Sequence, residues 1–114
     1  ENTKIIQTDA NDWIEKNSQE YKNKFDVIYL DAYIADIFKI KYSEKKDQMK
    51  TLCSMLNTDG IFVTNHIIYS DDFQKEISEH TNYISNYFSE IYTNIISKYS
   101  EADNVVIKGV YPIL

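Results

Sequence analysis

The fold is decided by residues 24–33, which read KFDVIYLDAY. From Phe25 to Leu30 the residues are apolar almost without interruption, whereas a strand with one solvated face would alternate apolar and polar residues. This pattern is typical of a strand that is covered on both faces, as in a parallel sheet. The run ends on Asp31, so we expect the chain to leave the core there and to present a carboxylate to a site.

Outward from this strand, strand-like and helix-like segments alternate. Two more strands are predicted at Lys4–Gln7 and, after an NTDG turn at 57–60, at Ile61–Thr64. Three helices are predicted. The first runs from Asn11 to about Tyr21 and follows a start signal at Asp9. The second begins after an N-cap at Ser43, and the third begins at Ser70. Two β-rich runs, Ile91–Lys98 and Asn104–Val110, predict a final antiparallel hairpin.

Because strands alternate with helices, we predict an α/β fold with a mainly parallel sheet. The C-terminal antiparallel hairpin is expected to add an antiparallel edge, which is common on such sheets. No linker, repeat or low-complexity tract interrupts the 114 residues, so residues 1–114 are expected to form a single domain.

Polar residues follow each of the three predicted strands. They are Asp9, Asp31 and the pair Asn65-His66. Ligands of open α/β sheets bind outside the carboxyl ends of the strands, so these side chains are expected to share one rim. Strand ends are also polar simply because loops are polar, and for each residue taken singly this alternative stays open.

The composition excludes several classes of partner. The net charge is −6 and every basic residue is Lys, so the forked Arg donor that suits phosphates and base edges is missing, which argues against nucleic-acid binding. No apolar run approaches the length of a membrane span. The single Cys53 fits a reduced, cytoplasmic setting, and its apolar neighbours predict a small buried residue.

Few other side chains suggest chemistry. His66 is a candidate base, although a His in this position more often caps a strand end, and His80 is expected to be a helix-face residue. Tyr33, beside Asp31, is a candidate for lining a substrate cleft or stacking on adenine. No His, Cys or carboxylate cluster has metal-ligand spacing, so no metal is expected.

Four blocks of the sequence together resemble a known family. They are IIQTDANDWI, KFDVIYLDAY, LNTDGIFVTN and FSEIYTNIISKYSEADNVVIKG. In this order they look like successive parts of the spermidine synthase-like aminopropyltransferases, which have the Rossmann-like fold of class I S-adenosylmethionine-dependent methyltransferases. The resemblance covers nearly the whole chain, and the last hairpin with its terminal NVVI favours the spermidine synthase branch.

The resemblance implies roles for individual residues. Asp9, with Ala10 behind it, matches the acidic residue that accepts a hydrogen bond from the adenine amino group. Asp31 matches the first acidic residue of the catalytic loop, which faces the attacking amine and the sulfonium centre. The family's second acidic residue, three positions later, is replaced here by Ile34.

The resemblance also places the family's Gly-rich loop and the acidic residue that holds the ribose ahead of Glu1. These 114 residues contain no G-x-G element, and their glycines are Gly60 and Gly109. We therefore expect the C-terminal part of a Rossmann-like domain, in which two strands absent from this sequence would lie between Lys4–Gln7 and Phe25–Leu30.

The implied function is transfer of an aminopropyl or methyl group, as in polyamine biosynthesis. The donor would be S-adenosylmethionine or its decarboxylated form, and the acceptor a small amine or methyl acceptor. Asp31 would be catalytic, Asp9 and Ala10 would bind the donor, and Tyr33, Asn65 and His66 would bind substrate. The alternative is a non-catalytic remnant or interaction module that retains the fold.

The edge of the Phe25–Leu30 strand predicts how the protein associates. Left bare, this edge would expose unpaired N–H and C=O groups on a flat apolar strand. We expect either a two-fold homodimer or a chain that brings Lys4–Gln7 beside Phe25–Leu30.

Overall fold

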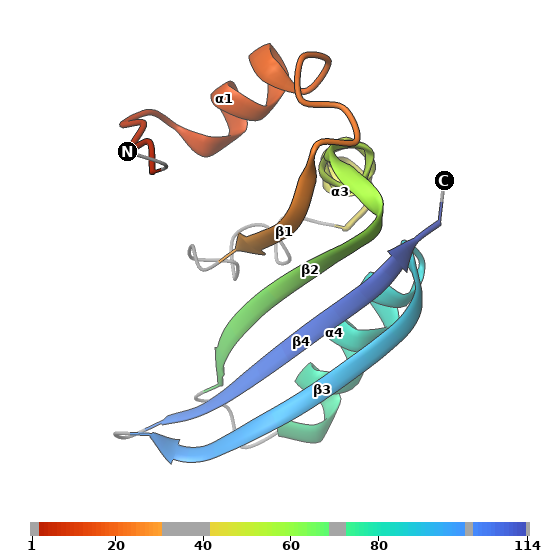
Figure 1. Ribbon diagram of the computed structural model, residues 1–114. Helices are drawn as coiled ribbons and strands as arrows, with labels where there is room; N and C mark the ends of the chain where they lie inside the picture. The colour runs from red at the N-terminus through yellow and green to blue at the C-terminus, as the bar shows by residue number, and fades with distance from the viewer. Residues whose placement is uncertain (1–2, 31–41, 69–72, 100–101, 114) are drawn as a thin grey trace.

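A computed structural model of the chain describes residues 3–30, 42–68, 73–99 and 102–113. Within these ranges the elements follow in the order α1 (Ala10–Asn17), β1 (Phe25–Leu30), α3 (Tyr42–Met55), β2 (Leu56–Ile68), α4 (Phe73–Ser85), β3 (Phe88–Tyr99) and β4 (Ala102–Pro112). The protein is thus mixed α/β (Figure 1). None of the helices described is long and apolar enough to cross a membrane.

The strands form one mixed sheet in the order β1-β2-β4-β3. β1 runs parallel to β2, whereas β4 is antiparallel to both β2 and β3. The sheet is therefore largely antiparallel, and the expectation of a mainly parallel sheet is wrong. The reason is the position of β4, which lies between β2 and β3 and not at the outer edge of the sheet. β4 therefore makes two antiparallel pairings, one with β2 and one with β3.

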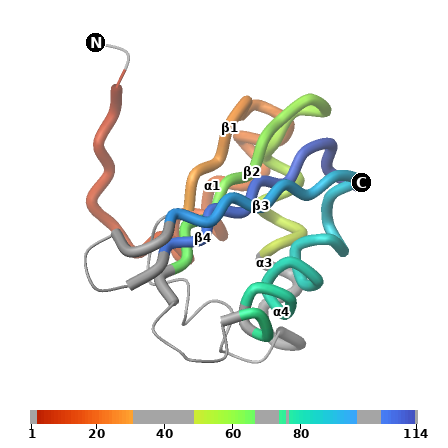
Figure 2. The backbone as a smooth tube through the Cα atoms, turned by 90° about the horizontal axis from the view of Figure 1, so that it is seen from below, coloured from red at the N-terminus to blue at the C-terminus, as the bar shows by residue number. Residues whose placement is uncertain are grey.

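The N-terminal strand predicted at Lys4–Gln7 does not form. Residues 3–8 are exposed and pair with no strand, and Ile5 is 91% exposed. The second expectation for the β1 edge, pairing with Lys4–Gln7, is therefore not met within the chain. In Figure 2 this segment stands apart from β1.

β2 is longer than the predicted strand at Ile61–Thr64. Its ladder with β4 continues from Ile61 opposite Val110 to Ile68 opposite Asp103. The antiparallel partner thus extends β2 at its C-terminal end, past the last β1 pair, Leu30 opposite Thr64.

The predicted NTDG turn lies inside β2, where it forms a bulge in the pairing with β1. Phe25 lies opposite Leu56 but Val27 lies opposite Ile61, so residues 57–60 bulge out opposite a single β1 residue. Asn57 Oδ1 accepts a hydrogen bond of 3.0 Å from the Asp59 N–H. A Cβ on Gly60 would lie 2.9 Å from the Asn57 carbonyl oxygen, so the close approach favours glycine.

The start of α1 follows the sequence, but its end does not. Asp9 has extended dihedrals (φ −66°, ψ 129°), and its side chain caps the helix, as the start signal predicts. The helix ends at Asn17 rather than near Tyr21. Turns occupy the next residues up to Asn23, whose φ of 57° is incompatible with a continuing right-handed helix.

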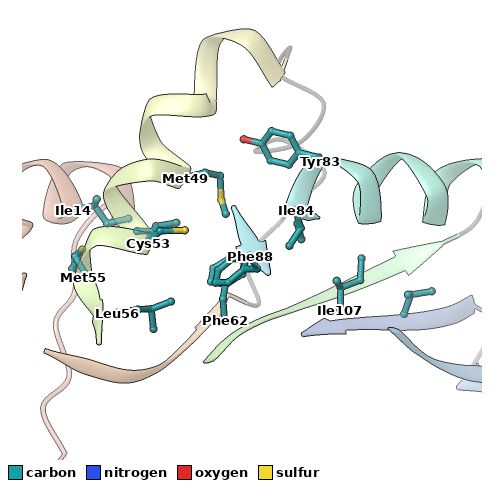
Figure 3. Packing of buried hydrophobic residues seen from close by; sticks show 12 residues of the cluster. Ile14, Met49, Cys53, Met55, Leu56, Phe62, Tyr83, Ile84, Phe88 and Ile107 are labelled. Atoms are coloured by element: carbon teal, nitrogen blue, oxygen red, sulfur yellow. The ribbon is translucent and has the colours of Figure 1, made fainter. Parts of the chain in front are cut away.

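The core lies on one face of the sheet. Helices α3 and α4 cover this face in Figure 2, and Ile14 of α1 belongs to the same cluster of buried residues. At its centre the rings of Phe62 and Phe88 stack at 5.6 Å (Figure 3). The other members are Met49, Leu52, Cys53, Met55, Leu56, Tyr83, Ile84, Val105 and Ile107. Cys53 is 3% exposed, which confirms the prediction of a small buried residue.

The opposite face of the sheet is not covered by the described elements. Val27 and Tyr29 of β1 are 54% and 56% exposed, and Tyr92 and Ile96 of β3 are exposed to a similar degree. The expectation that β1 is covered on both faces is therefore wrong. The helices that pack on the sheet share one side, and the side chains alternate between the two faces of each strand.

Candidate functional site

A cleft of about 390 Å³ lies between the N-terminal segment, α1, β1 and α3. Its walls are almost wholly apolar, and the larger side chains on them include Trp13, Phe25 and Met55. Among the lining residues Lys4 is the one with a charged side chain. A cleft of this kind suits a ligand, or part of one, that is flat or apolar.

Asp9 and Ala10 are next to each other where the N-terminal segment enters α1. Ala10 lines the cleft. Asp9 Oδ1 accepts hydrogen bonds from the Asn11 N–H at 2.9 Å and the Asp12 N–H at 3.1 Å. Both bonds go to one oxygen, so Oδ2 keeps acceptor capacity on this exposed side chain. The carboxylate thus has a structural role as a helix cap and can still accept from a ligand.

The catalytic candidate Asp31 and the substrate-binding candidate Tyr33 lie outside the described residues. The residue before Asp31, Leu30, lines the cleft. Leu30 lies opposite Thr64, so the described end of β1 lies beside the middle of β2. Leu30 is thus the last described residue before the predicted catalytic loop.

Asn65 and His66 do not line the cleft, and they point away from each other. His66 is on the covered face and 5% exposed, whereas Asn65 is half-buried on the other face. Neither residue ends a strand, since β2 continues to Ile68. Their substrate-binding role stays a prediction, but His66 does not reach solvent in this arrangement.

His66 belongs instead to a small buried cluster. Its Nε2 lies 2.9 Å from Oγ1 of Thr64, which is fully buried, and its ring stacks on that of His80 with centroids 4.4 Å apart. Burial, with a smaller contribution from His80, lowers the pKa of His66 to about 3. The imidazole is therefore neutral near pH 7.

The sequence did not predict two features of this region. An aromatic series joins α1 to β1, with Trp13 and Tyr21 at 5.3 Å and Tyr21 stacked on Phe25 at 5.3 Å. The spacing of these aromatic residues was a usable signal. The stacking of His66 on His80 had no local signal, because one residue is on a strand and the other on a separate helix.

The cleft can hold a flat apolar group against aromatic walls, and Asp9, which does not itself line the cleft, follows Thr8 and precedes Ala10 on its wall. The part of the chain that the structure describes contains no group of three or more His, Cys, Asp or Glu that could hold a metal ion. The arrangement therefore favours binding through apolar contact.

Two comparisons with known proteins identify no relative of this chain. A scan against protein-family models gives no match, and a search of curated proteins gives none either.

Proposed function

We propose that these residues belong to a spermidine synthase-like transferase, which moves an aminopropyl or methyl group from an S-adenosyl donor to a small acceptor. The observation that carries this proposal is the lining of the cleft. It brings together Ala10, which follows Asp9, and Leu30, which precedes Asp31. The family resemblance assigns these two aspartates to the adenine and to the reacting centre.

Two features of the fold are compatible with the proposal. β1 and β2 are parallel, and the chain ends in the antiparallel hairpin of β3 and β4. Because one fold hosts many functions, the assignment of a reaction rests on the cleft and not on the strand order.

The donor fits the described residues in part. The resemblance has its adenine amino group donate to Asp9, the residue before the cleft-lining Ala10, and the flat base would lie against the apolar wall that includes Trp13. The ribose and the aminopropyl or amino-acid end need groups that the described residues around the cleft do not supply. The proposal therefore requires a Gly-rich loop after a strand in the sequence encoded ahead of Glu1.

The reaction in this proposal is a displacement at carbon. The nitrogen of the acceptor amine attacks the carbon attached to the sulfonium, the new C–N bond forms, and the C–S bond breaks. The bonding pair stays on sulfur, which becomes a neutral thioether, and the amine loses a proton. Asp31 would orient the amine and take up that proton, which is a role that suits a carboxylate beside a cationic centre.

A non-catalytic interaction module is the second candidate. The observation that favours it is that Asp9 already has a structural task, the capping of α1. Reading the sequence encoded ahead of Glu1 separates the two candidates, because a G-x-G loop after a strand supports the transferase and its absence supports the module.

Donor binding provides the first direct test. The 114-residue chain alone is expected to bind S-adenosylmethionine, its decarboxylated form or methylthioadenosine more weakly than micromolar, and calorimetry measures this. A protein extended through the Gly-rich loop is expected to bind the donor. In that protein Asp9→Ser keeps a good N-cap but is too short to reach adenine, so it should weaken binding about tenfold without lowering stability. Micromolar binding by the 114 residues alone would contradict the proposal.

Turnover provides the second test. In the extended protein Asp31→Asn is expected to lower turnover by about 10²-fold, the scale of losing a general base. Asp59→Asn, an exposed residue in the β2 bulge, serves as the matched control and should leave turnover unchanged. Equal turnover in the Asp31→Asn variant and the control would assign Asp31 to structure.

A further inference from the structure

His66 lies at the end of the core that β1 does not reach. β1 pairs with β2 as far as Thr64, whereas β2 continues to Ile68 with β4 as its partner. In this extension His66 is 5% exposed on the covered face, and it lies opposite Val105, which is also buried. Its Nε2 lies 2.9 Å from the Thr64 hydroxyl oxygen. The imidazole therefore depends on a helix to shield it from solvent.

The helix that covers this end of the core is α4, and it does so with a second histidine. The ring of His80 stacks on that of His66, with centroids 4.4 Å apart and ring planes inclined by 14°. His80 is half-buried, so the covering ring itself touches solvent. Water can reach the imidazole of His66 from this side only if the part of α4 that contains His80 moves away.

A positive charge on His66 is disfavoured while α4 is in place. Among the described side chains, those that face it are Thr64 from β2, Val105 from β4 and His80 from α4. The first two do not titrate, and a proton on His80 would add a like charge. Burial, with a smaller contribution from His80, accordingly lowers the pKa of His66 to about 3. The charges of Lys75 and Glu79 on α4 are exposed to solvent.

The two ends of α4 are held unevenly by the described side chains. The last turn contains Tyr83 and Ile84, which are 7% and 0% exposed and lie in the core (Figure 3). Before His80, Ile77 is half-buried, and the side chains of Gln74, Lys75, Ser78 and Glu79 are exposed. Two helical turns that leave the sheet lose their order, because isolated short helices are marginal in water. The first part of α4 can therefore open while the last turn remains packed.

We propose that residues 73–80 form an acid-released segment, which leaves the sheet when His66 takes up a proton, while the last turn of α4 stays in the core. In the open form His66 is hydrated and binds a proton as an ordinary imidazole does. Because the open form binds this proton more tightly than the closed form, a falling pH shifts the equilibrium toward opening. The opening is local and differs in this from unfolding of the whole chain. The inference does not depend on the proposed function.

The test is hydrogen exchange of single amides in the 114-residue chain, followed by NMR at pH 7 and pH 5 and corrected for the intrinsic pH dependence of exchange. With a pKa of 6.5 in the open form and about 3 in the closed form, the opening constant should increase about 25-fold over this range. Amides 77–80, which bond within the helix, should exchange faster by this factor. The reference amides are Asn86 and Tyr87, bonded to Tyr83 and Ile84, and 61–64 of β2, and their rates should not change.

Two variants remove the titrating ring. Thr64→Val with His66→Phe deletes the polar pair, and His66→Gln keeps a polar partner for the Thr64 hydroxyl, so either one decides if the other fails to fold. Both should abolish the faster exchange at 77–80. Glu79→Gln, which removes an exposed carboxylate from the same helix, is the control and should retain it. Unchanged rates at 77–80 in the wild type, an equal increase at the reference amides, or an increase that persists in a folded His66 variant would overturn the inference.

Discussion

His66 should make the stability of the folded protein depend on pH. Its imidazole is 5% exposed, and burial lowers its pKa from 6.5 to about 3. Well above pH 6.5 both the folded and the unfolded state hold the imidazole neutral. As the pH falls below 6.5 the unfolded chain takes up a proton, which the folded protein takes up only near pH 3. The free energy of unfolding therefore decreases as the pH falls through this window.

The size of the effect follows from linkage. Between about pH 7 and about pH 5.5 the unfolded state gains most of one proton on this residue and the folded state gains almost none. The expected loss is about 1.3 kcal/mol of unfolding free energy. This loss is insensitive to the folded-state pKa, because that pKa lies well below the range of the experiment.

The assay is urea unfolding of the 114-residue chain at the two pH values. The reference is the double variant Thr64→Val with His66→Phe, which removes the titrating ring together with the Thr64 hydroxyl that pairs with it. The double variant should lose about 1.3 kcal/mol less than the wild type over the same range. Equal losses in both proteins would refute the assignment to His66 and mean that the pH dependence comes from other groups.

Two further predictions concern stability. Gly109→Ala should lower the free energy of unfolding by about 1–3 kcal/mol, because the added methyl would lie 2.6 Å from ring carbons of Phe88 in the core. The control Val106→Ile, on the uncovered face, should change the free energy of unfolding by less than about 0.5 kcal/mol. An unchanged free energy of unfolding in Gly109→Ala would disprove the clash. Asp9→Ala should lower the free energy of unfolding, measured in urea, by about 1 kcal/mol because α1 loses its cap. Glu20→Ala, at an exposed residue, is the control and should leave the free energy of unfolding unchanged. Equal values for the two variants would mean that the cap does not stabilise the protein.

Local sequence patterns predicted the elements whose signals are local. The β1 strand at Phe25–Leu30 and the capping of α1 by Asp9 agree with the structure. So does the final hairpin, although its strands are longer than the β-rich runs at both ends. Apolar runs, capping residues and turn residues act over a few positions, so they are visible in the sequence alone.

The candidate site was predicted only in part. Asp9 caps α1 and Ala10 lines the cleft, while their role in binding a donor stays a prediction. His66 looked like a strand-end residue near a rim, but it lies inside β2 against Thr64 and His80. Its environment depends on which helix covers β2, and no local pattern in the sequence contains that information.

The sequence alone was enough to predict the α/β class, the order of the described elements after residue 9, and the burial of Cys53. The tertiary structure decided that β4 inserts between β2 and β3, that the described helices cover one face of the sheet, and that residues 3–8 remain unpaired. The physical reason is the range of the interactions. A strand forms its period from neighbouring residues, but its partner, its direction and its covered face are set by hydrogen bonds and contacts between residues far apart in the chain.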